Sequence, residues 1–375
     1  MERAKHGNEQ LRQVVERFQA WGDFVGAQPY GSGHINDTYR VEVSLAGTPV
    51  HYLLQRINHA IFKQPDCVMA NILRVTEHLC GKLAAAGAAD ASRQTLTVLP
   101  ARDGRPYVRD DEGNWWRLYL FIERARTFDI IESERQAYQA ARSFARFQNQ
   151  LADLPAPRLH ETIPAFHNTL KRLEALDAAA AADVCGRRAE VAAELAFVEA
   201  RREQCGRLLA RNAAGEIPER ITHNDTKINN VMLDDATGEG ICVIDLDTVM
   251  PGLALYDFGD MVRSATAAAK EDERDLSKVG SRLAMFKALA EGYLSEARFL
   301  LPAEVEELAF SGRLITLTIG IRFLTDYLSG DVYFRTHRPG QNLDRCRTQL
   351  QLVRSMEAQA DEMQAIVRAT CGGRT

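Results

Sequence analysis

The stretch ITHNDTKINNVML, residues 221–233, decides how the rest of this 375-residue chain is interpreted. It places His223, Asp225, Lys227 and Asn230 in the spacing HxDxKxxN. Phosphoryl transfer needs a carboxylate that faces the acceptor hydroxyl and, a few residues later, an oxygen ligand for magnesium. The spacing therefore predicts a phosphoryl-transfer loop in which Asp225 is the catalytic base and Asn230 binds the metal.

A second carboxylate follows downstream, where the apolar run 241–244 ends at Asp245 in ICVIDLD. The intervening segment DDATGEG, residues 234–240, has the Asp and Gly content of a tight turn, so VML and ICVI are predicted to pair as a hairpin. The hairpin would bring Asn230 and Asp245 together as magnesium ligands. The alternative for Asp225 and Asn230 is a hydrogen-bonded turn without catalysis. The alternative for Asp245 is a carboxylate at the end of a strand that faces water.

A literal DFG stands at residues 257–259, the letters that protein kinases use at their metal site. It follows the chain breaker PG and opens a helical stretch where the metal motif would close a strand. We therefore predict that Asp257 is a helix-start cap and that Asp245 is the metal ligand. His223, two residues before the base, is expected to brace the loop backbone and not to transfer protons.

Composition limits the class of protein. The chain is long enough for two lobes with separate cores, and 46% of its residues are hydrophobic. Lys and Arg total 46 against 51 Asp and Glu, with no long run of one sign, which argues against a general nucleic-acid or anionic-membrane binder. No signal peptide or membrane span is predicted. Seven scattered cysteines without a CxxC pair indicate buried thiols in a reducing cytoplasm, and no zinc site is expected.

The amino-terminal third predicts strands and a glycine-bearing turn. Residues 30–43 and 51–58 have the pattern of a hairpin. At its start, Gly31, Ser32 and Gly33 would let backbone amides approach the nucleotide phosphates, as in a kinase glycine-rich loop. The alternative is that the two glycines mark only a turn.

A cation is also expected on the strand that contains HYLLQRIN. Its only interior basic residue is Arg56, which would hold the α- and β-phosphates of ATP in place of the usual lysine. Glu77, on a helix predicted for residues 66–83, is the candidate partner of Arg56. The alternatives are a solvated Glu77 and an exposed Arg56, because Gln55 occupies the other face of the strand and the register is open.

Strands at TLTVL, PYVRD and WWRLYLFIE complete a small antiparallel five-stranded lobe that ends at residue 123. We expect this lobe, residues 1–123, to bind the nucleotide, with adenine at the strand end near Ile122 and Glu123. Residues 124–375 form the predicted second lobe, which is mainly helical and holds the catalytic loop. Its helices are expected at residues 132–151, 164–176, 187–209, 276–294, 302–328 and 342–367.

Taken together, these motifs resemble the aminoglycoside phosphotransferase and choline kinase superfamily, in which a strand ending IDxD replaces DFG. Asp245 and Asp247 match that pattern. The combination of GSGHINDTY, LLQRIN, HNDTKINN, IDLDTVMPG, YDFGD and IRFLTDYLSGDVYF is similar to N-acetylhexosamine 1-kinases within it. The resemblance implies an α+β, bilobal, protein-kinase-like fold, with ATP and Mg²⁺ as cofactors and Lys227 beside the nucleotide.

The resemblance also implies an acceptor site for an N-acetylhexosamine that is phosphorylated on its anomeric 1-hydroxyl. Members of this family bind the sugar through five residues, and the matching positions in this chain are His34, Asp225, Asp245, Arg322 and Tyr333. From the residues alone, Arg322 could instead form an ordinary helical ion pair with Asp326, and His34 could bond only to the backbone.

Two other functions remain open. One is a kinase of another small alcohol, such as choline, homoserine, methylthioribose or an aminoglycoside. The other is a kinase-like regulator that binds nucleotide without catalysis. The expected partners are ATP and a small sugar, without nucleic acid or membrane, and the expected location is the cytoplasm. The sequence leaves oligomeric partners and the preferred sugar epimer open.

Overall fold

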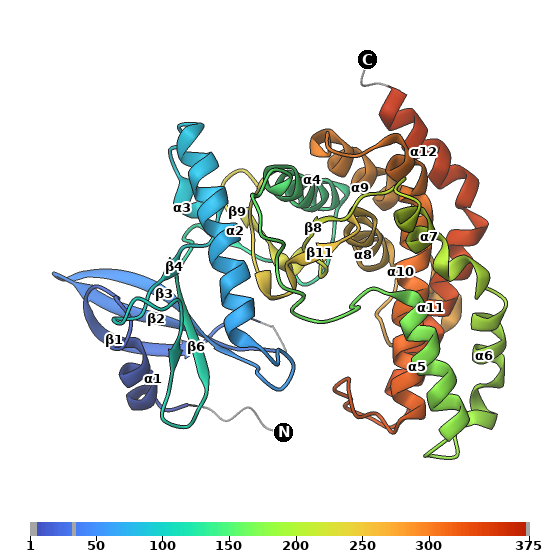
Figure 1. The fold of residues 1–375 in the computed structure, drawn as a ribbon, viewed down its shortest axis with the longest axis horizontal. Helices are drawn as coiled ribbons and strands as arrows, with labels where there is room; N and C mark the ends of the chain where they lie inside the picture. The colour runs from blue at the N-terminus through green and yellow to red at the C-terminus, as the bar shows by residue number, and fades with distance from the viewer. Residues whose placement is uncertain (1–5, 32–34, 373–375) are drawn as a thin grey trace. The chain divides into compact units, whose positions relative to one another are not determined.

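The computed structural model describes residues 6–31 and 35–372, and the chain divides into two compact units (Figure 1). Unit 1 takes three stretches of the chain: Met1–Asp129, Asp153–Ile163 and Asn230–Met250. Unit 2 takes the rest: Ile130–Ala152, Pro164–Asn229 and Pro251–Thr375. In the prediction the chain passes from one lobe to the other once, between residues 123 and 124. In the structure it passes between the two units several times.

A buried asparagine explains part of this exchange. The side chain of Asn71 bonds both the N–H and the C=O of His160, at 2.9 and 2.8 Å, and the C=O of Val249 at 3.0 Å. Buried backbone groups must find partners. Asn71 supplies them for two segments that are distant in sequence, and so both segments belong to unit 1.

The main sheet of unit 1 has the order β1-β2-β3-β6-β4, with β5 paired to β6. Its strands are β1 (Asp23–Pro29), β2 (Asp37–Leu45), β3 (Thr48–Ile57), β4 (Val98–Leu99), β5 (Val108–Arg109) and β6 (Trp115–Leu120). All pairs are antiparallel, as predicted. The sixth strand, β1, was missed because it is a mostly exposed edge strand whose register shifts between Phe24 and Gly26.

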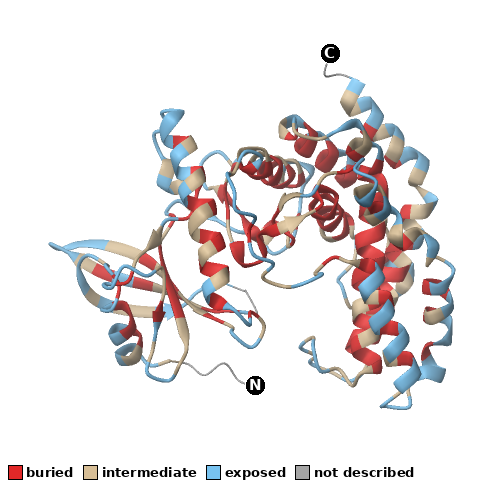
Figure 2. Ribbon diagram, in the orientation of Figure 1, coloured by how far each residue is buried: buried red, intermediate tan, exposed pale blue. Residues whose placement is uncertain are grey.

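The two faces of this sheet differ in chemistry because side chains alternate along each strand. One face packs against α1 (Asn8–Val15) and forms a hydrophobic core with members such as Val41, Leu54, Trp116 and Leu118. These strands are drawn with red, buried stretches in Figure 2. The other face carries the cross-strand neighbours Thr38, Gln55 and Arg117.

A second, three-stranded sheet in unit 1 has the order β10-β9-β7. Its strands are β7 (Ala125–Arg126), β9 (Val231–Asp234) and β10 (Gly240–Val243). Gly240 pairs with Leu233 and Val243 with Val231, so the hairpin predicted after the catalytic loop is confirmed. Unit 1 also contains α2 (Pro65–Ala85), α3 (Ala91–Gln94) and the short 3-10 turn η4 (Leu246–Thr248).

Unit 2 is mainly helical, as predicted. Its helices are α4 (Glu134–Leu151), α5 (Thr169–Ala182), α6 (Ala192–Glu199), α7 (Arg207–Ala213), α8 (Ala254–Thr266), α9 (Leu283–Glu296), α10 (Pro302–Leu328), α11 (Gln341–Ala358) and α12 (Ala360–Gly372). The short strands β8 (Arg220–Thr222) and β11 (Met250–Gly252) pair with each other. The α+β class with an antiparallel sheet and a separate helical part is therefore confirmed.

Helix α10 organises unit 2, and its predicted bounds are confirmed. It packs against α5, α8, α11 and α12. By length and composition α10 could cross a membrane, but 83% of its most apolar window is buried inside the protein (Figure 2). A helix that is apolar on all sides and surrounded by other helices has the pattern of a core helix.

The single helix predicted for residues 187–209 is wrong. The segment breaks into η1 (Arg188–Val191), α6, η2 (Glu203–Gly206) and α7. Gly206, the N-cap of α7, lies against the side chain of Leu170, whose nearest carbons would be 3.6 Å from a Cβ at that position. Glycine is a poor helix former, and Gly206 stands at the boundary between η2 and α7 without changing the apolar periodicity from which one helix was predicted.

Candidate active site

The predicted catalytic loop follows β8 in unit 2, and a buried aspartate fixes its backbone. His223 and Asn224 donate their amide N–H groups to the two carboxylate oxygens of Asp257, at 2.8 and 2.7 Å. Asn224 has a φ of 66°, in the left-handed region, which few residues other than Gly adopt without support. These bonds support the bent turn whose next residue is Asp225.

The prediction that Asp257 caps a helix is wrong. The N-cap of α8 is Leu253, and Asp257 lies in the first turn with its side chain bonded to the loop. Its carboxylate also accepts a hydrogen bond from Gln148 Nε2 at 2.6 Å, and Gln148 accepts one from the hydroxyl of Tyr293. Burial raises the pKa of Asp257 to about 7, although these donors lower it. A carboxylate engaged by three N–H donors agrees with the interpretation that this DFG is not the metal site.

The other two letters of this DFG are also structural. Phe258 is buried and its ring lies 5.1 Å from that of Tyr293 and 6.0 Å from that of Phe286. A Cβ on Gly259 would lie 2.5 Å from the backbone oxygen of Ser311 on α10. Only glycine allows α8 and α10 to approach this closely.

Asp225 forms an ion pair with Lys227, with Nζ and Oδ1 2.7 Å apart. Burial by itself would raise the pKa of Asp225, but Lys227, His223 and Arg263 together lower it to about 2. Asp225 in turn raises the pKa of Lys227 against the effect of burial. Both groups are therefore charged at neutral pH, and Asp225 is a weak base.

A second ion pair braces the loop from α8, and the sequence analysis did not identify it. Asp260 accepts the amide N–H of Thr226 at 3.1 Å, and Arg263 Nε donates to the other oxygen of Asp260 at 2.8 Å. Both charged residues are buried. The available signal was an acidic and a basic residue three positions apart, on the helical face that also carries Asp257.

Two histidines contact the loop backbone. His223 Nδ1 accepts the N–H of Asp225 at 3.3 Å, which agrees with the bracing role expected for it. His167 was not anticipated, and its Nε2 bonds the carbonyl of Asn224 at 2.8 Å. Burial lowers the pKa of His167 to about 4. The ring is therefore neutral at pH 7 and Nε2 carries the hydrogen, since a carbonyl can only accept.

Arg322 and Tyr333, which are eleven residues apart in sequence and were predicted to bind the same ligand, are in contact. Arg322 Nη2 lies 3.4 Å from the Tyr333 hydroxyl, and the guanidinium carbon is 5.6 Å from the Tyr333 ring, 5.1 Å from Phe166 and 5.3 Å from Phe334. The alternative ion pair with Asp326 is not found among the described residues. Burial lowers the pKa of Arg322, and Tyr333 opposes that effect.

The predicted metal ligands lie on the β9–β10 hairpin of unit 1. The N–H of Ile244 donates to the backbone oxygen of Asn230 at 2.9 Å, so the residue before Asp245 is held beside Asn230. Asn230 is buried, whereas Asp245 is exposed and has a left-handed φ of 57°. The proximity expected from the hairpin is present in the backbone.

The second aspartate of IDLD has a different environment. Asp247 forms a buried ion pair with Arg117 and accepts a hydrogen bond from Asn36 Nδ2 at 2.7 Å. Arg117 Nε donates to Gln55 at 2.9 Å, and the amide N–H of Asn58 donates to Asn36 at 3.0 Å. Sequence reasoning missed this network, although one arginine inside the strand WWRLYL was a signal that a buried charge required a partner.

The register decides the face on which Arg56 lies, and its predicted role as the phosphate clamp stays a prediction. Arg56 lies on the opposite face of β3 from Gln55 and the Asp247 network, because successive side chains alternate. There it forms an ion pair with Asp37 and a 3.2 Å bond with Asn114. Glu77, the predicted partner of Arg56, is exposed on α2. Arg117, on the same face as Gln55, is the cation that pairs with Asp247.

Of the predicted glycine-rich turn, Gly31 lies just after β1 with a φ of 77°, which favours glycine. Ser32, Gly33 and His34 lie outside the described residues, and so their predicted roles stay predictions.

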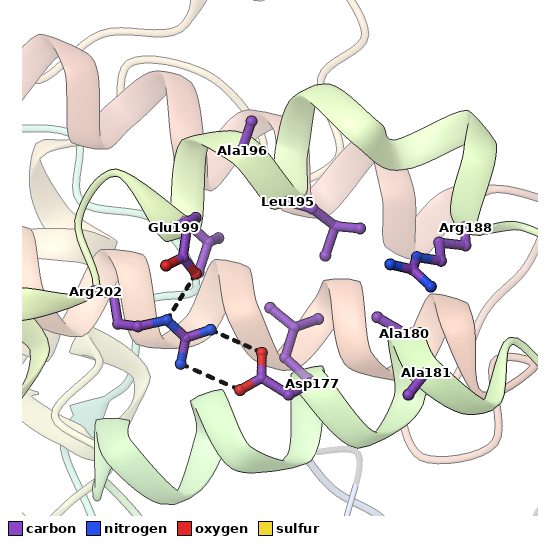
Figure 3. A pocket seen from close by; sticks show the side chains of 10 residues that line it. Asp177, Ala180, Ala181, Arg188, Leu195, Ala196, Glu199 and Arg202 are labelled. Carbon is purple, nitrogen blue, oxygen red and sulfur yellow. Dashed lines mark hydrogen bonds and ion pairs between the residues drawn. The ribbon is translucent and has the colours of Figure 1, made fainter.

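A surface pocket of about 340 Å³ lies between α5 and α6 (Figure 3). Arg202 bridges its edge through ion pairs with Asp177 and Glu199 at 2.8 and 2.7 Å. None of the residues of the predicted catalytic loop lines this pocket.

Several solved structures share this fold. An aminoglycoside phosphotransferase from Alicyclobacillus acidocaldarius subsp. acidocaldarius DSM 446 is 13% identical, with a TM-score of 0.54 over 96% of this chain and 95% of that one. A choline kinase from Cryptosporidium parvum Iowa II is 14% identical, with a TM-score of 0.54 over 96% and 97%. A spectinomycin phosphotransferase in complex with ADP and spectinomycin is 14% identical, with a TM-score of 0.53 over 98% and 99%. The protein-kinase-like fold is thereby confirmed.

The sequence profile described as the phosphotransferase enzyme family matches residues 26–291, which include both the glycine turn and the catalytic loop. That span is more than half of the chain, and the chain therefore belongs to the phosphotransferase enzyme family.

Proposed function

We propose that this protein is an ATP- and magnesium-dependent kinase that phosphorylates the anomeric 1-hydroxyl of an N-acetylhexosamine in the cytoplasm. The observation that carries the proposal is the arrangement of unit 2, where a braced, ionised Asp225 shares the unit with the Arg322–Tyr333 pair. The resemblance to N-acetylhexosamine 1-kinases supplies the sugar. The ADP of the spectinomycin phosphotransferase complex supports a nucleotide as the second substrate.

The donor set of unit 1 suits magnesium. Mg²⁺ prefers oxygen ligands and is held in kinases by one or two protein groups together with the phosphates of the nucleotide. Asn230 and Asp245 offer an amide oxygen and an exposed carboxylate from adjacent positions of one hairpin. Both are therefore the proposed ligands. When bound, the ion would neutralise charge on the β- and γ-phosphates.

The proposed role of Asp225 is to orient the sugar hydroxyl. Its pKa of about 2 makes it a poor acceptor for a proton that is still bound to an alcohol. Because the transition state of phosphoryl transfer is loose, the proton can leave late, and a fixed carboxylate then contributes mainly by positioning the nucleophile. The bonds from the loop backbone to Asp257 hold Asp225 in that place.

The electrostatics of unit 2 favour a neutral acceptor over a cationic one. Arg322 occupies the space among Phe166, Tyr333 and Phe334, so these rings already hold a cation. Choline or an aminoglycoside would require carboxylates or an aromatic cage without a resident cation. A guanidinium that can donate to hydroxyl or acetamide oxygens suits a neutral sugar.

The test is magnesium-dependent ATP consumption with N-acetylglucosamine, N-acetylgalactosamine, galactose, choline and an aminoglycoside offered separately, with the product position assigned by phosphorus NMR. We expect a 1-phosphate from an acetamido sugar. Asp225→Asn should lower kcat about 10²- to 10⁴-fold. Turnover with a cationic acceptor alone would overturn the sugar assignment, and nucleotide binding without turnover would favour the regulator.

Two further variants separate the carboxylates. Asp245→Ala is expected to abolish magnesium-dependent turnover while the protein remains folded, because Asp245 is an exposed ligand. Asp257→Ala is expected mainly to destabilise the protein, since it removes a buried acceptor of three hydrogen bonds. The reverse pattern would place the metal at the DFG.

A further inference from the structure

One buried carboxylate of unit 2 bonds neither the catalytic loop nor an arginine within residues 6–31 and 35–372. Asp326 lies in the last turn of α10, one turn after Arg322, and only 4% of its surface is exposed. Its sequence position fits a helical ion pair with Arg322. The carboxylate bonds instead to the chain that follows the helix.

The bonds fill all the acceptor positions of Asp326. Oδ1 accepts the amide N–H groups of Val332 and Tyr333, at 2.9 and 2.7 Å. Oδ2 accepts the amide N–H of Phe334 at 2.9 Å and Nδ2 of Asn342 at 2.8 Å. A carboxylate has about four lone-pair sites, so none remains for Arg322. Three successive amides that converge on one anion form a nest, in which the anion here is the chain's own carboxylate.

The nest determines where two aromatic side chains lie. Residues 332–334 follow the helix end, where Asp331 has a left-handed φ of 61°, so the turn requires support. Tyr333 and Phe334, whose amides are bound, place their rings 5.6 and 5.3 Å from the guanidinium carbon of Arg322. Phe334 also packs on Phe323 at 4.6 Å.

We propose that Asp326 is a positioning residue for acceptor binding, which holds residues 332–334 so that Tyr333 meets Arg322. The inference rests on the proposed function in one respect, that Arg322 and Tyr333 contact the acceptor. It makes no assumption about which acceptor that is. The geometry requires that Arg322 remain unpaired with Asp326 and so retain its donors for a ligand.

The variant that tests this is Asp326→Asn, which keeps the shape. An amide has one oxygen, so in either orientation its NH₂ group would face two N–H donors. We expect the acceptor KM to rise about tenfold or more, the scale that follows from losing hydrogen bonds to a charged group. The KM for ATP should stay within about twofold, because the proposed phosphate and magnesium contacts, Gly31, Asn230 and Asp245, belong to unit 1. Asn342→Ala, which removes one donor of four, should give a smaller rise.

Glu304→Gln is the matched control. Glu304 is a buried carboxylate on the same helix that accepts bonds from Arg220 at 2.8 and 2.7 Å and from the N–H of Leu301 at 2.8 Å. It lies at the other end of α10, about 33 Å from Asp326 at 1.5 Å per residue. Its loss should lower the melting temperature and leave the acceptor KM unchanged. An equal rise in acceptor KM for both variants would show general destabilisation and overturn the proposal.

Amide hydrogen exchange of residues 332–334 supplies a readout that needs no acceptor. Asp326→Asn should speed exchange there by at least about tenfold, and Glu304→Gln should not, because local protection depends on local hydrogen bonds. Unchanged exchange in Asp326→Asn overturns the proposal, as does faster exchange with an unchanged acceptor KM. If the acetamido sugars fail as substrates, the KM comparison uses the acceptor that turns over, and the sugar assignment fails alone.

Discussion

The carboxyl groups of Asp225 and Asp257 have pKa values that are shifted in opposite directions, because their surroundings differ. Asp225 has a cation beside it, and its pKa falls to about 2. Asp257 is buried and accepts hydrogen bonds only from neutral N–H groups among the contacts described above, and burial raises its pKa to about 7. The same residue type is therefore ionised in one position and near its titration point in the other. Burial raises the pKa of Asp257, which has no cation among its bonded partners named here, whereas Lys227 beside the partly exposed Asp225 outweighs burial there.

A pH-dependent stability follows from Asp257. A carboxyl whose pKa is raised by folding contributes stability below its unfolded pKa, near 3.9, and loses it as pH rises through about 7. The free energy of unfolding of the wild type, relative to that of Asp257→Asn, should therefore increase as pH falls from about 7 toward 5. Urea denaturation of both proteins between these values measures the difference.

Two other groups set the window for that measurement. Asp225, with its lowered pKa, loses its contribution only below about pH 4, outside the range. Burial lowers the pKa of His167 to about 4, so its contribution is lost as pH falls through 6.5 toward 4, the opposite sign. Comparison with Asp257→Asn removes both contributions. Parallel curves for the two proteins would show that Asp257 remains ionised throughout.

Between elements, close approach and buried charge decide the packing. Helices α8 and α10 meet at Gly259, and strand β6 meets the η4 turn through the Arg117–Asp247 pair. Neither contact is local in sequence. Each one ties a part of the predicted site to the scaffold that carries it.

Gly259→Ala is expected to destabilise the protein by about 1–3 kcal/mol, the usual cost of overpacking a core. The added methyl group would lie 2.5 Å from the oxygen of Ser311. Chemical denaturation measures the change. Gly238→Ala tests the cost of the methyl group without a close contact, since that Cβ meets nothing within 4 Å, although its φ of 68° adds some backbone strain. A stability loss no larger than that of Gly238→Ala would show that α8 shifts to accommodate the methyl group.

Arg117→Met is expected to cost about 3–5 kcal/mol because it leaves Asp247 buried without its charge partner. The double variant Arg117→Met with Asp247→Leu should recover much of this loss, since a buried ion pair often contributes little net stability. Activity should not recover with it, because Asp247 supports the turn next to Asp245. Recovery of both properties would mean that the pair serves only the fold.

Each of the two units of the molecule is built from three segments of the chain, and not from one segment on either side of residue 123. Residues 230–250 belong to unit 1, although they follow helices α4, α5, α6 and α7 of unit 2 in the chain, and they include the partner of Arg117. Unit 1 is therefore complete only when residues 230–250 are present.

A fragment of residues 1–129 should therefore fail to fold independently. It lacks Asp247, β9 and β10, which leaves Arg117 buried without its carboxylate and β7 without a partner. Adding a peptide of residues 230–250 in trans should increase its ordered structure. Circular dichroism and thermal melting measure both effects, and a cooperative melt of the fragment alone would contradict the prediction.

The sequence by itself determined the features that depend on local pattern. The catalytic spacing, the β9–β10 hairpin and the bounds of α10 all follow from neighbours within a few residues, where turn chemistry and apolar periodicity act. The rejection of the literal DFG was likewise a local argument, from its place at the start of a helix. It was right about the helix and wrong about the cap.

Only the tertiary structure decided the partners of the buried charges. Arg56 and Gln55 are adjacent in sequence, and a shift of one residue exchanges their faces, so only the sheet register decides which face each occupies. Asp257 bonds a loop more than thirty positions earlier, and Arg117 bonds Asp247 across 130 positions. Such pairs are selected by the cost of burying an unpaired charge in the folded chain, and that cost has no signature in the spacing along the sequence.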